Sequence, residues 1–179
     1  MKTSRKNVAN NDHSDLVDTL RAEWHAQSPE LDTRAIDVVG RVTRLSSLWD
    51  QQINQALQPF DLSYTDFDIL ATLRRSGEPF ELLPTQLCDC ILLTSGAMTN
   101  ALARLQKKSL VLRRVSKEDR RQKFVRLSAA GRKKVEEAAA VRFGIAQEQI
   151  LALGRREATT LAALLKTLAL DHEAKRRSD

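Results

Sequence analysis

Few side chains in this sequence are of the types and spacings that carry catalysis or bind metals. The histidines, His13, His25 and His172, lie far apart, and none has metal-ligand spacing to a cysteine. There is also no glycine-rich phosphate loop, no nucleophile elbow and no constellation of paired catalytic carboxylates. These absences predict a protein that is not an enzyme and that needs no metal and no cofactor.

The two cysteines, Cys88 and Cys90, are two positions apart on an expected helix, so their side chains point about 200° apart around its axis. A bond between them is therefore unfavourable. We expect both to be buried small apolar residues, with a redox role as the alternative. The sequence has no disulfide framework, and this favours the cytoplasm as its location. Its start is polar and it has no apolar run of membrane-spanning length, so we expect no membrane partner.

The basic residues are concentrated in one stretch of the chain. Between Arg104 and Lys134 there are thirteen basic residues against two acidic ones, a net charge of +11. Since the whole chain carries +6, the remainder carries −5. A basic segment inside an otherwise acidic protein is typical of nucleic-acid contact, although a solvated basic face is the alternative.

The pattern of apolar residues predicts a mainly helical chain. Apolar residues recur every three or four positions, as at Val38, Val42 and Leu45, which is the spacing of an amphipathic helix. The expected helices cover 14–27, 33–57, 64–75, 84–91, 94–108, 129–153 and 155–171, and two short strands cover 110–115 and 123–127. The ends, 1–13 and 174–179, are expected to be a disordered tail and a frayed one.

This order of elements predicts a winged helix-turn-helix, in which 94–108 is the recognition helix and the two strands form a β-hairpin wing. The helix has an apolar face, with Ala97, Met98, Ala101, Leu102 and Leu105, and a polar face that fits the major groove of DNA. Asn100 is placed to read an adenine edge, and Thr99 a thymine methyl or a phosphate; simple solvation is the alternative. The positions expected to face outward are Ser95, Gly96, Thr99, Asn100, Ala103 and Gln106. The candidate DNA-binding residues of the helix are Thr94, Ser95, Gly96, Thr99, Asn100 and Arg104.

The wing supplies the second set of candidate DNA contacts. Arg120 and Arg121 lie at the expected hairpin tip, where they can reach a narrow minor groove. The spacing of Asp119 and Arg121 lets the carboxylate hold the guanidinium in an extended pose. Contacts to the DNA backbone are expected from Arg113, Arg114, Lys117 and Lys123.

The segment TSGAMTNALARLQKKSLVLRRVSKEDRRQKFVRLSAAG resembles the recognition helix and wing of the MarR family of bacterial transcriptional regulators. In this resemblance the wing arginine of the family matches Arg121, and its partner aspartate matches Asp119. The resemblance implies a triangular homodimer that binds a short inverted repeat. It implies that residues 14–60 and 129–173 form the dimerisation helices and that residues 61–128 form the winged helix-turn-helix domain.

A narrower resemblance is to the PecS and urate-responsive branch of that family. It rests on Trp24 followed by SPELD, on the extra N-terminal helix, and on LRRSGEPFELLPTQL followed by LLTSGAMT. It implies a ligand held near Trp24. Ala101 and Ala103 stand where such relatives commonly carry charges, which argues against urate and leaves a different small aromatic or acidic effector open.

Trp24, Arg44 and Trp49 are the candidate ligand-binding residues. For Trp24 the alternative is packing, and for Trp49 it is the core or the dimer interface. Arg41 and Arg44 are candidates to face a cavity and balance an anionic ligand, with exposure to solvent as the alternative. The sequence therefore predicts a homodimeric DNA-binding regulator, a repressor released by a small ligand. The alternative is a helical scaffold or a nonspecific nucleic-acid or RNA-binding protein.

Overall fold

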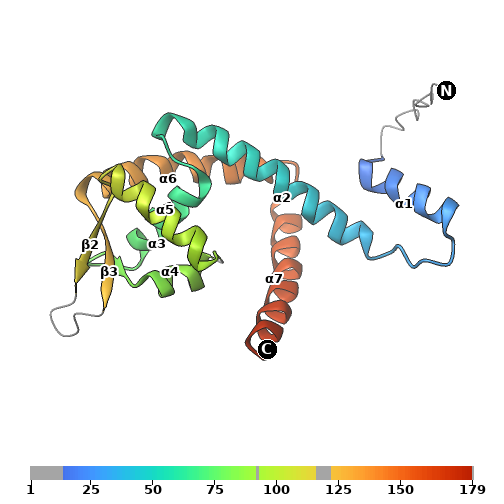
Figure 1. The fold of residues 1–179 in the computed structure, drawn as a ribbon. Helices are drawn as coiled ribbons and strands as arrows, with labels where there is room; N and C mark the ends of the chain where they lie inside the picture. The colour runs from blue at the N-terminus through green and yellow to red at the C-terminus, as the bar shows by residue number, and fades with distance from the viewer. Residues whose placement is uncertain (1–13, 92, 116–121, 179) are drawn as a thin grey trace, which may run out of the picture. The chain divides into compact units, whose positions relative to one another are not determined.

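The computed structural model describes residues 14–91, 93–115 and 122–178, and the chain divides into two compact units, 1–51 and 52–179 (Figure 1). Helices dominate both units, and the second also holds a small antiparallel sheet, which confirms the predicted fold class. No helix among the described residues is long and apolar enough to cross a membrane.

The first unit contains α1 (Leu16–Gln27) and the first part of α2 (Ile36–Leu57). α1 ends directly before Ser28 and Pro29, as the sequence predicts, because the residue before a proline is disfavoured in a helix. α2 begins at Ile36 rather than at position 33. The side chain of Asp32 accepts hydrogen bonds from the backbone nitrogen and the guanidinium of Arg34, and such local bonds compete with helix formation.

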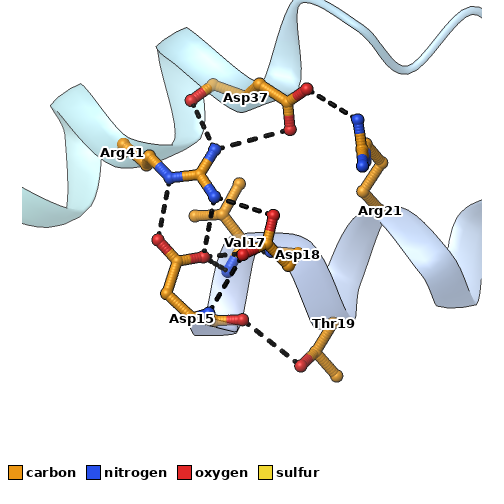
Figure 2. Close-up of polar contacts among 7 residues, drawn as sticks. All are labelled: Asp15, Val17, Asp18, Thr19, Arg21, Asp37 and Arg41. Carbon is orange, nitrogen blue, oxygen red and sulfur yellow. Dashed lines mark hydrogen bonds and ion pairs between the residues drawn. The ribbon is translucent and has the colours of Figure 1, made fainter. Parts of the chain in front are cut away.

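An arginine of α2 holds α1 in the first unit (Figure 2). Arg41 donates from Nε to Asp15 and from Nη2 to Asp18, both at 2.8 Å, and from Nη1 to the backbone oxygen of Asp37 at 3.0 Å. Arg21 of α1 donates to the Asp37 carboxylate at 2.7 Å. The pKa values of Asp15 and Asp18 lie below the ordinary value, because each side chain accepts a backbone hydrogen bond from the other residue and a hydrogen bond from Arg41.

Apolar packing contributes little to the position of α1. Val17, 3% exposed, is its one buried residue, and it packs over Gly40, where a Cβ would lie 3.1 Å from Val17 Cγ1. Leu16, Leu20 and Trp24 remain 43–50% exposed. The ionic network is therefore the main link between α1 and α2.

In the second unit, α3 (Tyr64–Arg75), α4 (Pro84–Ile91) and α5 (Ser95–Lys107) follow a short 3-10 turn, η1 (Gln58–Phe60). Ser63 and Asp66 form a capping box at the start of α3, and Thr94 caps α5. These signals lie in the sequence, and the predicted bounds of α3 and α4 are confirmed. The core residues that these helices share are almost fully buried: Leu70, Leu73, Leu87, Met98, Leu102 and Leu105.

The sheet has the order β1-β3-β2, formed by β1 (Glu81–Leu82), β2 (Val111–Val115) and β3 (Lys123–Leu127). β2 and β3 make the predicted hairpin, and Figure 1 shows them projecting together from the helices of this unit. β1 was not predicted, because two residues are too few to show an alternating pattern. It pairs with β3 through Glu81 opposite Arg126 and Leu82 opposite Val125.

The chain ends with α6 (Ala129–Gln149), capped by Ser128, and α7 (Arg155–Ser178). α6 stops before the predicted position 153. α7 continues past the predicted end at 171, so the expected frayed tail is helical through Ser178. Lys175 donates to Asp171 at 2.6 Å, an ion pair across one helical turn, and no glycine or proline interrupts the segment.

Gly131 and Gly144 make a matched test of packing in α6. A Cβ at Gly131 would lie 2.1 Å from the carbonyl oxygen of Leu110, whereas a Cβ at Gly144 meets no described atom within 4 Å. Gly131→Ala should lower the free energy of unfolding by about 1–3 kcal/mol, the usual cost of overpacking. Gly144→Ala should raise it by up to about 1 kcal/mol, because alanine favours the helix. Urea denaturation followed by circular dichroism measures both, and a Gly131→Ala protein as stable as the wild type would contradict this packing.

The ionic network makes a prediction about α1. Arg41→Gln should speed hydrogen exchange of the α1 backbone amides several-fold, because little apolar packing holds this helix, and added salt should act in the same direction. Arg44→Gln is the control, since Arg44 lies on the same helix, is exposed and has no ion pair among the described residues. Equal exchange in the two variants would show that Arg41 does not hold α1.

Candidate nucleic-acid interface

α5 has the two faces that a recognition helix needs. Met98, Ala101, Leu102 and Leu105 are buried, as predicted, and pack α5 on α3, α4 and β2. Ala97 is exposed and does not belong to that face, contrary to the prediction, because it lies in the first turn beyond the reach of the core. The exposed residues include every predicted groove-facing position: Ser95, Gly96, Thr99, Asn100, Ala103 and Gln106.

The N-terminal half of α5 offers polar groups and open space. The side chain of Thr94 accepts from the backbone nitrogen of Ala97, and the Thr99 hydroxyl donates to the backbone oxygen of Ser95. Asn100 has no hydrogen-bond partner within the described part of the chain, so its amide is available to a ligand. A side chain at Gly96 would meet nothing within 4 Å, which leaves room for close approach. This end of the helix also carries the positive pole of the helix dipole.

Arg104 has a partner inside the protein. Its Nη2 donates to Oδ1 of Asp66 at 2.8 Å, and the Asp66 side chain is only 3% exposed. The same carboxylate accepts from the backbone nitrogen of Ser63 at the start of α3. The half-exposed Arg104 therefore connects α5 to α3, in addition to any contact it makes with DNA.

The two arginines predicted on the first wing strand differ in their surroundings. Arg113 is exposed, and its Nε donates to the side-chain oxygen of Gln106 on α5 at 3.1 Å. Arg114 is half-buried and donates from two nitrogens to the Glu81 carboxylate, which lowers the pKa of Glu81. Lys123 is exposed at the start of β3. The predicted tip residues Lys117, Asp119, Arg120 and Arg121 lie outside the described residues.

Glu81 and Gln106 are the residues around the wing that sequence reasoning missed. Both lie in segments that carry the family resemblance, but neither residue type shows by itself that it pairs with a wing arginine. Glu81 follows the SGEPF turn, and only the pairing of β1 with β3 brings it near the wing. Gln106 was predicted to face outward from α5, but its role as a hydrogen-bond acceptor for Arg113 depends on the hairpin geometry.

The cysteine prediction was wrong. Cys88 is half-buried and Cys90 is exposed, because α4 is short and buries only Leu87. Within the ranges 14–91, 93–115 and 122–178, no group of three or more histidine, cysteine or acidic side chains is arranged to hold a metal ion.

The predicted ligand residues lie in the first unit. Trp24 is 50% exposed, Arg44 is exposed and Trp49 is half-buried. Arg41, considered as a cation for an anionic ligand, is occupied by carboxylates. Among the described residues, none of these side chains lines the cavities of the second unit that we found.

A cavity of about 610 Å³ lies between α3 and α6. Its lining combines aromatic and cationic side chains, and the guanidinium of Arg142 lies 5.6 Å from the ring centroid of Tyr64. Burial raises the pKa of Asp68, while Arg75 and Arg142 oppose that shift. The residues that line the cavity are Tyr64, Phe67, Asp68, Ala71, Arg74, Arg75, Val135, Glu136, Ala139, Arg142, Phe143 and Ala146.

Comparison with known proteins relates the chain to one family. Residues 60–122 match the sequence model described as MarR family. The chain is 31% identical over 115 residues to the HTH-type transcriptional regulator PecS of Dickeya dadantii, a match that spans 64% of this chain and 69% of that protein. It is also 31% identical over 83 residues to the HTH-type transcriptional regulator MhqR of Bacillus subtilis, spanning 46% of this chain and 54% of that protein.

Solved structures show the same fold. A mutant of MarR from E. coli, complexed with operator DNA, is similar with a TM-score of 0.67 and 25% identity, covering 87% of this chain and 99% of that chain. AbsC, a MarR family transcriptional regulator from Streptomyces coelicolor, is similar with a TM-score of 0.72 and 23% identity, covering 80% of this chain and 98% of that one.

Proposed function

The chain belongs to the MarR family of DNA-binding transcriptional regulators, and from this we propose that it binds an inverted-repeat operator as a homodimer and represses transcription until a small ligand releases it. The observation that carries the proposal is the exposed polar face of α5 beside a basic hairpin. The apolar face of the same helix is buried, so the polar face is presented rigidly. Members of this family regulate transcription and are not enzymes.

In this proposal the N-terminal half of α5 enters the major groove. Ser95, Gly96, Thr99 and Asn100 approach base edges, and Thr94 lies near a phosphate at the helix N-terminus. Arg104, Arg113, Lys117 and Lys123 contact the DNA backbone, and Arg120 and Arg121 reach the minor groove, with Asp119 holding Arg121. The likeness to the MarR–operator complex supports this assignment.

Exposed apolar side chains support the homodimer and the proposed dimerisation segments 14–60 and 129–173. On α7, Leu161, Leu164, Leu165 and Leu168 recur at helical spacing and are 37–61% exposed. An apolar stripe of this kind is unfavourable in water, and a second copy of the chain would cover it. α1 and α2 carry similar exposed residues in their own unit: Leu16, Leu20, Trp24, Val38, Val42 and Leu45.

The α3–α6 cavity supports control by a small ligand. Its volume falls in the usual range for ligand pockets, and its aromatic and arginine side chains suit a small aromatic acid. Trp24, Arg44 and Trp49 stay as proposed ligand contacts from the sequence alone. The cavity is better supported as the ligand site than these three residues, because its aromatic and arginine side chains line one cavity.

Selection of DNA from a randomised library tests the proposed function. The wild-type protein should select an inverted repeat and prefer it strongly over scrambled DNA, and sedimentation should find two chains on each duplex. Arg121→Ala should weaken binding to the selected duplex by about 1–3 kcal/mol, the value of a good arginine contact in a groove. Lys175→Ala, which removes the same charge outside the proposed DNA contacts and dimerisation segments, is the control and should bind like the wild type.

Three outcomes would contradict this proposal. A protein that enriches no sequence and binds all duplexes alike would be a nonspecific nucleic-acid binder. A monomer at micromolar concentration would exclude the homodimer. An Arg121→Ala protein with unchanged affinity would remove the wing from the interface.

A thermal-shift screen with urate, xanthine and phenolic acids tests the ligand site. We expect an aromatic acid to raise the melting temperature and to weaken binding to the selected duplex, because ligand binding stabilises the state that it prefers. Arg142→Met should abolish the shift. Lys133→Met, on the same helix but outside the lining, should keep it. A shift that survives Arg142→Met would place the ligand elsewhere.

A further inference from the structure

The outer face of the three-stranded sheet carries an ionic contact that crosses all three strands. In the strand register, Glu81 of β1 lies opposite Arg126 of β3. Phe124, two residues before Arg126, lies opposite Arg114 of β2. Residues opposite each other, and residues two apart on one strand, share a face of a sheet. Glu81, Phe124 and Arg114 therefore lie on the same face, one on each strand, and we name these three residues the strand clamp.

The clamp has the geometry of a strong contact. The Nε and Nη2 atoms of Arg114 donate to the two oxygens of Glu81, the Nε bond measuring 2.9 Å, so the pair is bidentate. The guanidinium of Arg114 lies 5.3 Å from the ring centroid of Phe124, which stands on β3 between the strands of Glu81 and Arg114. The Glu81 side chain is only 10% exposed, which strengthens the contact by excluding water.

This geometry directs the cation of Arg114 along the sheet toward β1. Its neighbour Arg113 points to the opposite face, where it is exposed and bonds to Gln106 of α5. Two adjacent arginines of one strand thus have different surroundings, because successive side chains of a strand point to opposite faces. Arg114 was predicted to contact the DNA backbone, and its position favours a different role.

We propose that Glu81 and Arg114 are positioning residues of the wing, which hold β2 against β1 across β3 and touch no DNA. Arg114 lies one residue before the end of β2 at Val115, so the clamp holds the last part of that strand, next to the proposed tip. It thereby sets the direction of the hairpin whose tip the proposed function assigns to the minor groove. The proposal rests on that function, since it concerns how the tip is aimed.

Glu81→Gln tests the proposal, because two explanations predict opposite changes in its affinity for DNA. Removing an acid from the surroundings of bound DNA should strengthen DNA binding if only charge matters, because phosphate repulsion is lost. The clamp predicts the opposite on the duplex that the wild-type protein selects from a randomised library: affinity falls about tenfold, the scale of one lost charged hydrogen bond. Affinity for a scrambled duplex should stay the same or rise. Equal or tighter binding of Glu81→Gln to the selected duplex would overturn the proposal.

Arg114→Lys tests the same point at constant charge. A lysine cannot form the fork, so we expect affinity for the selected duplex to fall about tenfold with an unchanged salt dependence. Arg113→Gln is the matched control, and it should lower the slope of log K against log salt by about one, as a phosphate contact does. An Arg114→Lys protein that binds like the wild type, or an Arg114→Gln protein whose slope falls by about one, would make Arg114 a phosphate contact instead.

The readouts separate failure of the clamp from other failures. If the wild-type protein selects no duplex, the proposed function fails before the variants are compared. Circular dichroism and melting temperature identify a variant that does not fold; should Glu81→Gln be one, Arg114→Lys and Arg114→Gln still decide between the two roles.

Discussion

Met98, Leu102 and Leu105 bury one face of α5 against α3, α4 and β2, and the proposed DNA-binding surface depends on that burial. A helix that rotated about its axis would bring Ser95, Thr99 and Asn100 away from solvent and expose apolar surface in their place. The free energy of burying these three side chains, about 1.5–3 kcal/mol each, opposes such rotation. The buried face thus keeps the polar face of α5 turned toward solvent, where the proposed function requires it.

α3 takes part in several of the contacts described. The Asp66 carboxylate accepts from the backbone nitrogen of Ser63 at the start of α3 and from Arg104 of α5. The neighbouring Phe67 lines the cavity between α3 and α6. A ligand that displaced α3 would therefore act directly on the position of α5, because a nearly buried carboxylate cannot lose its cation without cost. This connection gives the proposed ligand control a physical route within one unit.

Elements with local start and stop signals were predictable from the sequence, and contacts between distant residues were not. α3 begins directly after the polar Ser63, α4 begins at Pro84 and α6 begins directly after Ser128, all at the predicted positions. By contrast, Arg114 was assigned to DNA because its partner Glu81 is 33 positions away and lies on a strand of two residues. Cys88 and Cys90 were misjudged because residue type alone does not show how little of α4 the core covers.

The charge count also needs the structure to be interpreted. Of the thirteen basic residues from Arg104 to Lys134, four of those described make ion pairs with acids outside that stretch: Arg104, Lys108, Arg114 and Arg132. The acidic remainder of the chain is thus partly used to neutralise the basic segment. Only cations that reach phosphates release counterions from DNA, so net charge overstates the number of contacts. Lys107, Lys123 and Lys133 are exposed and have no ion pair within the described residues. These lysines are therefore candidates for contacts to phosphates.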